Sequence, residues 1–412
     1  MKLLTISAFY PPFVIGGAEI CARNLSTWFA ARGDEVSVMT AAPTPADERW
    51  GESQDGVRVF RVSTPHLYPV ADARDQPGWK KPLWHVQDVL DPRTTANFDR
   101  VLDEVRPDFV HIHWIQGLGY RGLLPIARRD IPTAITLHDL AYPCLRTTMF
   151  RDGHECLAQC ADCRASATVK NRYLRAVPRL GFISPSRAIL AQASRFMPTM
   201  DRPTFHIHNP NIYPSSALPR PDGAPPRLLF VGRLENTKGI VFLLDEVLAP
   251  LAERRRFTLD VLGKGPEEEA LRRRYAGKSW VTIHGQVPLQ AVADAMATAD
   301  LCLMPSLWAE NSPGVVFQAL AASLPVMASD KGGLPELIVD GENGLLAPPG
   351  DAPAWTASLE LLLDSPDRLR AMRAAAGRSS DQYGYDHLAQ RMADAYDVIR
   401  TQPVGKQRSN AG

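Results

Sequence analysis

The stretch 303–337 constrains the fold of this chain of 412 residues more than any other segment. It begins in the apolar run 301–304, which is typical of a buried parallel strand. A helical pattern follows over 315–322, and we expect Ser312 to be its N-cap and Pro313 its first helical residue. A buried strand that leads into a helix is the repeating unit of α/β folds with a parallel sheet.

The start of this helix is also a candidate anion site. Gly314 leaves the first turn uncovered, so that backbone N–H groups there can bind a phosphate or diphosphate. Glu310 lies just before the helix and Gln318 lies inside it. Eight helical residues span about 12 Å, so these two side chains can lie on either side of a diphosphate. This distance is comparable with the size of a nucleotide sugar. An ordinary βα turn with two surface polar residues remains the alternative.

The motifs of this stretch resemble the donor site of the family 4 retaining glycosyltransferases (group 1 type). The matching residues are Glu310 with a polar residue eight positions later, Leu324-Pro325-Val326, Ala328-Ser329 and Gly332-Gly333-Leu334-Pro335-Glu336. The resemblance implies a GT-B fold, that is, α/β with two Rossmann-like doubly wound domains facing a cleft.

The same resemblance implies roles for single residues. Glu310 would contact the donor sugar, and the helix start at Ser312, Gly314 and Val315 would hold the diphosphate. In the family a second Glu binds the ribose hydroxyls, but this chain has Gln318 there. Because an amide carries no charge and only one terminal acceptor atom, weaker nucleotide binding or lost activity is an open consequence.

Composition excludes several classes of protein. A net charge of +1 gives no general attraction to nucleic acid, and no apolar run approaches the ~18 residues of a transmembrane helix. The N-terminal apolar run is short and closed by Pro11-Pro12, so we interpret it as a first strand and not a signal peptide. Six cysteines in such a chain favour reduced thiols and a cytoplasmic location.

A glycine pair separates the first predicted strand, 2–7, from a helix predicted over 18–32. Gly16 and Gly17 let the backbone approach a ligand with its N–H groups. Together with Tyr10, the two prolines and Ala18-Glu19, the pair is similar to the first loop of the same family, which implies that Gly16 and Gly17 contribute to the donor site.

Three histidines fall on or after strands of the N-terminal half. His111 and His113 alternate on a strand predicted over 108–113, and we interpret them as structural, with a site role for His113 as the alternative. His138 follows the strand predicted over 132–137, at the rim where open α/β sheets bind ligands. It resembles the histidine of the family that lies beside the transferred sugar. Residues 63–92 are predicted to be largely loop.

Four cysteines follow His138 with the spacing C-x11-C-x3-C-x2-C: Cys144, Cys156, Cys160 and Cys163. The last pair has the spacing of two ligands of one metal, so a structural zinc that holds the loop 139–165 is our hypothesis. Free thiols and disulfides are the alternatives. Cys21 and Cys302 are most simply buried small hydrophobic residues.

The segment 164–202 has a local excess of basic residues: Arg164, Lys170, Arg172, Arg175, Arg179, Arg187, Arg195 and Arg202. Such a surface suits anionic lipid headgroups, and hence a peripheral contact at the inner face of the membrane, or a phosphate-linked acceptor. A solvated basic face is the alternative.

We expect the domain boundaries at proline-rich and polar segments. The predicted parts are an N-terminal acceptor domain (1–208), a linker (209–226), a C-terminal donor domain (227–384), a helix that returns to the N-terminal domain (385–401) and a disordered tail (402–412). In the C-terminal domain, Arg233 and Lys238 follow a strand and precede a helix, as in the phosphate-binding segment of the resembling family.

These features predict a retaining glycosyltransferase that moves a sugar from a nucleotide diphosphate donor to a sugar, lipid-linked or small-molecule acceptor, in the synthesis of a polysaccharide, a glycolipid or a glycosylated metabolite. His138 and Glu310 are the predicted catalytic residues. No Asp-x-Asp pair occurs in the sequence, so we expect no metal or other cofactor in catalysis. A non-catalytic partner protein and an epimerase or phosphorylase of the same fold are the alternatives.

Overall fold

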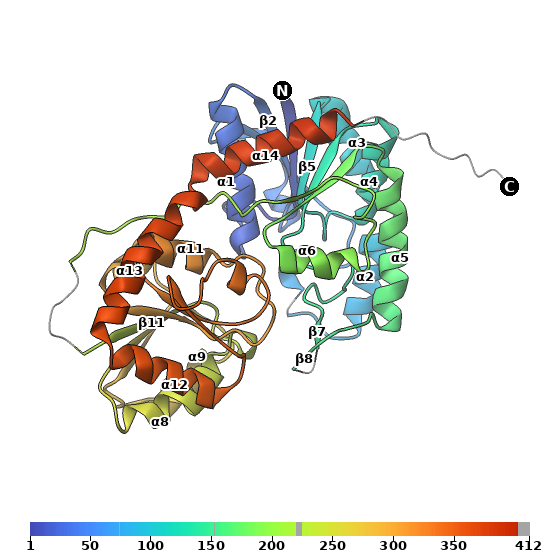
Figure 1. The fold of residues 1–412 in the computed structure, drawn as a ribbon. Coiled ribbons are helices and arrows are strands. Elements are labelled where there is room, and N and C mark those ends of the chain that lie inside the picture. The colour runs from blue at the N-terminus through green and yellow to red at the C-terminus, as the bar shows by residue number, and fades with distance from the viewer. Residues whose placement is uncertain (74, 152, 220–224, 403–412) are drawn as a thin grey trace. The chain divides into compact units, whose positions relative to one another are not determined.

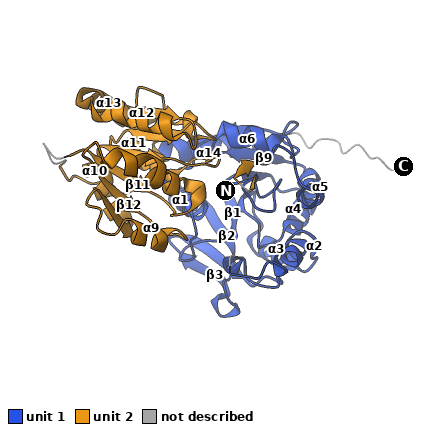
Figure 2. Ribbon diagram, turned by 90° about the horizontal axis from the view of Figure 1, so that it is seen from below, with its two compact units in different colours: residues 1–149, 156–211, 386–412 blue, residues 150–155, 212–385 orange. Residues whose placement is uncertain are grey.

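The computed structural model describes residues 1–73, 75–151, 153–219 and 225–402 (Figure 1). The chain forms two compact units, which are coloured separately in Figure 2. Unit 1 comprises residues 1–149, 156–211 and 386–412, and unit 2 comprises residues 150–155 and 212–385. The predicted tail lies outside the described residues from 403 onward, as does the part 220–224 of the predicted linker.

Unit 1 contains an eight-stranded sheet in the order β10-β9-β6-β5-β1-β2-β4-β3. Neighbouring strands are parallel, except for the antiparallel pair β3 and β4. The strands are β1 Lys2–Ser7, β2 Glu35–Ala41, β3 Arg49–Gln54, β4 Val57–Val62, β5 Phe109–Trp114, β6 Thr133–Thr136, β9 Leu180–Ser184 and β10 Thr204–His206. The helices are α1 Gly17–Ala31, α2 Lys80–Leu90, α3 Thr94–Val105, α4 Leu123–Arg128, α5 Ala161–Ala176, α6 Arg187–Ser194 and α14 Tyr385–Arg400.

The strand order of unit 1 reverses between β1 and β5. Ligands of open α/β sheets bind outside the carboxyl ends of the strands at such a reversal. The loop after β1 leads to Gly16, and His113 lies near the end of β5. The topology therefore brings these segments to the ligand-binding edge of the sheet.

The last helix, α14, lies beside α1 and β5 of unit 1 (Figure 1), and its Tyr396 is buried against both. The ring of Tyr396 stacks on Phe29 of α1 and on Phe109 of β5, with centroid distances of 5.2 and 4.3 Å. Its hydroxyl group lies 2.5 Å from Nδ1 of His111. An aromatic side chain with a buried, partnered hydroxyl group fixes both the position and the rotation of the helix.

The prediction that 63–92 is largely loop is wrong, because it contains α2. Trp84 is buried and donates its indole N–H to Tyr68 O at 2.8 Å, which secures one side of the helix. The sequence did not predict α2 because the side of the helix away from Trp84 is apolar although it is exposed, whereas the exposed side of a helix is usually polar or charged. Across the described residues, no helix combines the length and the apolar character needed to cross a bilayer.

Unit 2 contains a six-stranded parallel sheet in the order β13-β12-β11-β14-β15-β16. The strands are β11 Arg227–Val231, β12 Thr258–Leu262, β13 Val281–Gly285, β14 Leu301–Met304, β15 Val326–Ser329 and β16 Gly344–Ala347. The helices are α7 Ile240–Phe242, α8 Ala249–Ala252, α9 Glu268–Arg274, α10 Leu289–Thr298, α11 Gly314–Ala321, α12 Ala352–Leu363 and α13 Pro366–Ser380. A short hairpin, β7 Phe150–Arg151 and β8 His154–Glu155, also belongs to this unit.

Both faces of this second sheet are covered. Leu228 and Phe230 of β11 join one buried cluster, whereas Leu229 between them joins the other. A strand buried on both faces must be apolar throughout, as β11 is. The strand order reverses between β11 and β14, so the loops that follow these two strands lie next to each other at the ligand-binding edge.

Candidate donor site and histidine cluster

Glu310 is a buried polar side chain with several hydrogen-bond partners at the edge of the unit 2 sheet. It is buried, and its Oε1 accepts hydrogen bonds from Lys238 Nζ at 2.7 Å, Ser306 Oγ at 2.6 Å and Trp308 Nε1 at 2.8 Å. Lys238 comes from the loop after β11, and Glu310 comes from the loop after β14. The reversal of strand order thus brings together two residues that are 72 positions apart.

The environment keeps Glu310 ionised. Burial raises the pKa of this carboxyl group, but the ammonium group of Lys238 and the three hydrogen bonds outweigh burial, and the net pKa is lowered. The ammonium group also lies 5.0 Å from the centroid of the Trp308 ring. A fixed carboxylate next to a fixed cation can accept hydrogen bonds from sugar hydroxyl groups and attract a phosphate.

Two glycines allow the backbone segments of this site to approach each other. Gly239 has φ +73°, and a Cβ atom there would lie 1.8 Å from Pro305 O. Gly332 has φ +62°, and a Cβ atom there would lie 2.4 Å from Glu310 O. Gly333 N–H donates to the same oxygen at 2.7 Å. Only glycine fits these positions, so the glycine motifs of the sequence hold Lys238 and Glu310 in place.

Arg233 lies in the same loop as Lys238 and forms an ion pair with Glu235 at 2.9 Å. Its side chain is 40% exposed, so the guanidinium group is accessible to a ligand. A bound phosphate would have to compete with Glu235 for it.

The start of α11 differs from the prediction. The helix begins at Gly314 with Pro313 as its N-cap residue, so Ser312 is not the N-cap. Val316 N–H donates to Pro313 O at 3.0 Å, a bond that tightens the first turn. A Cβ atom at Gly314 would lie 2.8 Å from the hydroxyl oxygen of Tyr213, so this glycine makes room for a neighbouring phenol group. Val315 is the second residue of the helix and is partly buried.

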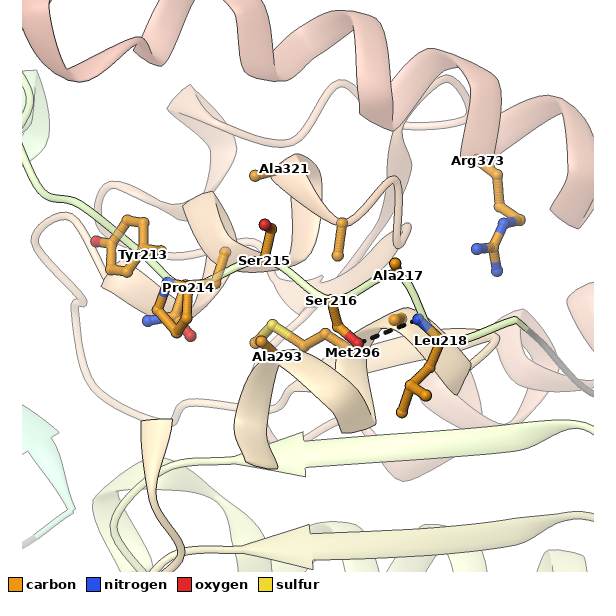
Figure 3. Close-up of a pocket in the computed structure, with 13 residues that line it drawn as sticks. Tyr213, Pro214, Ser215, Ser216, Ala217, Leu218, Ala293, Met296, Ala321 and Arg373 are labelled. Atoms are coloured by element: carbon orange, nitrogen blue, oxygen red, sulfur yellow. Dashed lines mark hydrogen bonds between the residues drawn. The ribbon is translucent and has the colours of Figure 1, made fainter. Parts of the chain in front are cut away.

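Gln318 lines a pocket of about 420 Å³ between the segment 213–218, α10 and α11 (Figure 3). Met296 and Ala293 of α10 form its floor, and Arg373 of α13 supplies a cation. Ser216 Oγ accepts the N–H of Leu218 at 3.3 Å, which closes a turn at the rim. This pocket is large enough for a small ligand, and its lining combines apolar side chains with the polar groups of Tyr213, Ser215, Ser216, Gln318 and Arg373.

In unit 1 the glycine pair is exposed, but one of its N–H groups is already used. Gly16 N–H donates to Glu19 Oε2 at 3.1 Å. Burial raises the pKa of the Glu19 carboxyl group. Gly17 is the first residue of α1, and a Cβ atom there would meet no atom within 4 Å.

His138 and His113 lie against each other at the edge of the unit 1 sheet. Nε2 of His138 is 2.9 Å from Nδ1 of His113, and the two rings are inclined by only 19°. Burial lowers the pKa of His138 to about 3, and burial together with the neighbouring histidines lowers that of His113 well below its usual value. Both imidazoles are therefore neutral at pH 7, with one ring donating and the other accepting.

His111 is structural, as interpreted from the sequence. Its Nε2 lies 2.7 Å from Thr136 Oγ1 and its Nδ1 contacts the hydroxyl group of Tyr396, so both ring nitrogens have partners. His113 differs, since it contacts His138. Cys21, interpreted as a small hydrophobic residue, is fully buried and lies close to both His113 and His138.

The four cysteines proposed as zinc ligands do not form one ligand group. Cys144 and Cys163 are buried and Cys160 is exposed, and all are free thiols. Hydrogen bonds from Cys163, chiefly from its backbone N–H, lower the pKa of Cys160. Cys156 directly follows the hairpin β7–β8, whereas Cys160 is the N-cap residue of α5 and Cys163 lies in the first turn of that helix.

The basic segment is only partly a surface. Arg164, Arg172 and Arg175 are exposed along α5. Lys170 is buried, with Nζ donating to Ala141 O at 2.7 Å and lying 4.2 Å from the Tyr120 ring centroid. Burial lowers its pKa to about 8. Lys170 lies two residues before the exposed Arg172 in the chain, so nothing in the sequence indicated that its side chain is buried.

Sequence reasoning missed Ser306 and Trp308 as partners of Glu310, and the pairing of His113 with His138. Ser306 and Trp308 precede Glu310 by four and two residues, so their nearness in the chain was the available signal. The histidine pair joins two strands, and only the order of strands in the sheet brings it together.

Comparison with protein families gives two matches. Residues 16–210 match the glycosyl transferase 4-like domain, and residues 225–365 match the glycosyl transferases group 1 family. Together the two matches cover most of both units.

Individual relatives agree with these matches. The chain is 28% identical to a glycogen synthase of Mycobacterium tuberculosis over 414 residues, which covers 96% of this chain and 94% of that protein. It is also 28% identical to a D-inositol 3-phosphate glycosyltransferase of Xylanimonas cellulosilytica, with 92% and 91% covered. The structure of HepE from Anabaena in complex with UDP-glucose is similar in fold, with a TM-score of 0.66, 17% identity, and 97% and 100% covered.

Proposed function

The chain belongs to the group 1 glycosyltransferases, has their GT-B fold and transfers a sugar from a nucleotide sugar; from this premise we propose that it is a retaining enzyme that binds the donor through unit 2 and the acceptor through unit 1. The observation that carries the proposal is the buried carboxylate of Glu310, held ionised by Lys238.

In this proposal the cations of unit 2 stabilise the leaving diphosphate. Lys238 and Arg233 lie in the loop after β11. The backbone N–H groups of Ser312, Gly314 and Val315 lie at the start of α11, after the neighbouring strand β14. Fixed donors of this kind stabilise negative charge as it develops in the transition state. No step of the scheme uses a metal.

Glu310 accepts hydrogen bonds from the sugar hydroxyl groups and orients the ring. His138 contacts the transferred sugar as a neutral imidazole, and its hydrogen bond with His113 fixes its ring. Gly16 and Gly17 line the approach to this edge of unit 1. Gln318 bonds the ribose with its neutral amide.

The relatives suggest a glucose donor. One curated relative is a glycogen synthase, and a structure of the same fold contains UDP-glucose. We propose UDP-glucose as the first candidate donor. A saccharide or a phosphate-bearing small molecule is the candidate acceptor, since another relative glycosylates inositol 3-phosphate.

An apolar stripe and a basic stripe on unit 1 support a peripheral membrane contact at the cytoplasmic face. Leu83, Val86 and Leu90 of α2 and its N-cap residue Trp79 are exposed and follow helical spacing, so they form one stripe. The exposed arginines of α5 lie on a helix that contacts α2. An apolar stripe beside cations is what an interfacial helix presents to anionic lipids.

A structural zinc at Cys144, Cys156, Cys160 and Cys163 remains a separate proposal, since binding would require these thiols to move together. Metal analysis of the purified protein tests it. About one zinc per chain, lost in the Cys160→Ser/Cys163→Ser variant, is the supporting result, and a metal-free protein overturns it.

The donor site is tested by replacing Glu310 with Gln. We expect the transfer rate to fall by roughly 100-fold, as when one fixed transition-state contact is lost. The matched control is Glu360→Gln, because Glu360 pairs with Arg254 on the surface of the same unit. Full activity of the Glu310→Gln variant would contradict the assignment.

The donor base is tested by thermal unfolding with UDP, GDP, ADP and their glucose conjugates. A ligand at ~100 times its dissociation constant stabilises the folded state by about 2.7 kcal/mol. We expect UDP and UDP-glucose to give the largest shifts. A chain that responds to none of them would favour the non-catalytic alternative.

A further inference from the structure

Three metal-ligating side chains meet at the ligand-binding edge of the unit 1 sheet. They are Cys21 of α1, His113 of β5 and His138 after β6, and one ligand atom of each lies within 4.8 Å of the others. Among the residues that the structure describes, no other group of three or more His, Cys, Asp or Glu side chains is this close. The three come from elements separated in the sequence, so the group is a product of the sheet topology.

The distance between the two imidazole nitrogens is close to the distance between two nitrogen ligands of one metal ion. Nδ1 of His113 and Nε2 of His138 are 2.9 Å apart, whereas two nitrogen ligands of a tetrahedral zinc, each about 2.05 Å from the ion, lie roughly 3.3 Å apart. An increase of a few tenths of an ångström in the distance between these two nitrogens would give the spacing of two zinc ligands. Nε2, the other ring nitrogen of His113, is buried and lacks a hydrogen-bond partner among the described residues, so no existing hydrogen bond prevents the ring proton from residing there when Nδ1 binds an ion.

The donor set selects the class of ion. One thiolate and two neutral imidazoles suit Zn²⁺ and the neighbouring transition metals and do not suit Mg²⁺ or Ca²⁺, which prefer oxygen. Three protein ligands leave a fourth position open, unlike a structural site. Cys21 and His113 are buried, and His138 is partly exposed, so an ion enters from the His138 side.

We propose that Cys21, His113 and His138 form a binding site for a divalent cation of the Zn²⁺ type, and that its occupancy inhibits sugar transfer. On binding, the Cys21 thiol releases its proton to solvent, and the imidazole that donates the His113–His138 hydrogen bond moves its proton to its other ring nitrogen. Both imidazoles then donate a nitrogen lone pair to the ion, with no change of oxidation state. The inhibition rests on the proposed contact of His138 with the sugar, because a metal-bound imidazole cannot make that contact.

The site is tested with Co²⁺, whose thiolate complexes have a charge-transfer absorption band. The full-length wild type, Cys21→Ser and Cys160→Ser/Cys163→Ser are titrated with Co²⁺ and then with Zn²⁺. Serine at position 21 keeps an atom that can hydrogen-bond Asn209 Oδ1, the partner of the Cys21 thiol at 3.6 Å. Thermal unfolding verifies that each variant folds, and Cys21→Ala is the substitute if Cys21→Ser does not.

We expect the band from one Co²⁺ per chain to disappear in Cys21→Ser, to persist in Cys160→Ser/Cys163→Ser, and to be displaced by Zn²⁺. A Cys21→Ser titration identical to that of the wild type, or no band in any protein, overturns the site. This readout does not depend on activity, so it decides the site even if no sugar transfer is found.

Inhibition is tested on sugar transfer with Zn²⁺ and with Zn²⁺ followed by EDTA. We expect reversible inhibition of the wild type and at least about tenfold lower sensitivity in Cys21→Ser, the usual scale for loss of a metal contact. Equal inhibition of both proteins overturns the inhibitory role while leaving a Co²⁺-binding site in place.

Discussion

At the scale of single residues, the buried pair of Lys238 and Glu310 dominates the donor site. The exposed fractions of the two side chains are only 19% and 6%, so each charge depends on the other for compensation. A buried ion pair with one partner removed leaves an unpaired charge, which is costly because the interior solvates it poorly. Arg233, by contrast, is 40% exposed and paired with Glu235, so its replacement should affect ligand binding more than stability.

Replacing Lys238 with Met should lower the free energy of unfolding of unit 2 by about 3 kcal/mol, because Glu310 then stays buried without a cation. Urea unfolding measures this change. Arg254→Met, which breaks an exposed pair with Glu360 in the same unit, is the control and should cost less than about 1 kcal/mol. Adding Glu310→Gln to Lys238→Met should restore part of the loss; a purely additive double variant would mean that the two residues are not coupled.

At the scale of elements, α2 and α14 differ in the burial of their apolar side chains. In α14, Tyr396 is completely buried between Phe29 and Phe109. In α2, Trp84 is buried, whereas Leu83 and Val86 on the other side are 55% and 54% exposed. An exposed stripe of this kind on an otherwise well-packed unit indicates a surface with a partner.

The α2 stripe should bind anionic vesicles. We expect Leu83→Ser/Val86→Ser to weaken binding to phosphatidylcholine vesicles containing phosphatidylglycerol by about tenfold or more, because two apolar side chains leave the interface. Arg172→Ala/Arg175→Ala should weaken it by roughly tenfold or more, and only at low salt. Co-sedimentation measures both.

The matched control is Leu361→Ser, since Leu361 of α12 is 47% exposed but belongs to unit 2. Equal binding of the wild type and the α2 variant would remove the membrane role from this helix. Binding that is equally strong to vesicles without anionic lipid would remove the role of the arginines.

At the scale of the whole molecule, buried titratable groups make stability depend on pH in two windows. Burial lowers the pKa of His111 and His138 from 6.5 to about 3 and that of His113 well below 6.5. The unfolded chain takes up protons at these groups near pH 6.5, and the folded chain does not. Glu310 behaves differently, since its folded pKa lies below the value of 4.5 of an unfolded carboxyl group.

Stability should therefore decrease as the pH falls from about 7 toward 4, because the unfolded state binds more protons at the three histidines. A second loss should begin below about pH 4.5, because the unfolded chain then binds a proton at residue 310 while the folded chain, in which the pKa of Glu310 is lowered, does not. Urea midpoints of the wild type measured from pH 8 to pH 4 test the first window. The difference between the wild type and Glu310→Gln tests the second, and should be constant above pH 5. A flat midpoint between pH 7 and pH 6 would contradict the neutral histidine cluster; below about pH 6 the folded chain also takes up a proton at Asp139, whose pKa burial raises to about 6, and this opposes the loss.

The sequence by itself determined the alternation of strands and helices and the positions of Lys238, Glu310 and His138 at the ends of strands. These features depend on local periodicity and on glycine and proline signals, which neighbouring residues carry. The stretch 303–337 was sufficient to predict the donor-site family, which the comparisons confirmed.

The tertiary structure alone decided which of these residues meet. The pairing of Lys238 with Glu310 and the group of Cys21, His113 and His138 depend on the order of strands in each sheet, which reverses at β11 and β14 in one unit and at β1 and β5 in the other. The burial of Lys170 likewise depends on its tertiary contacts with Ala141 and Tyr120. Strand order is set by packing between segments that are distant in the sequence, and for that reason spacing along the chain did not predict which of these residues meet.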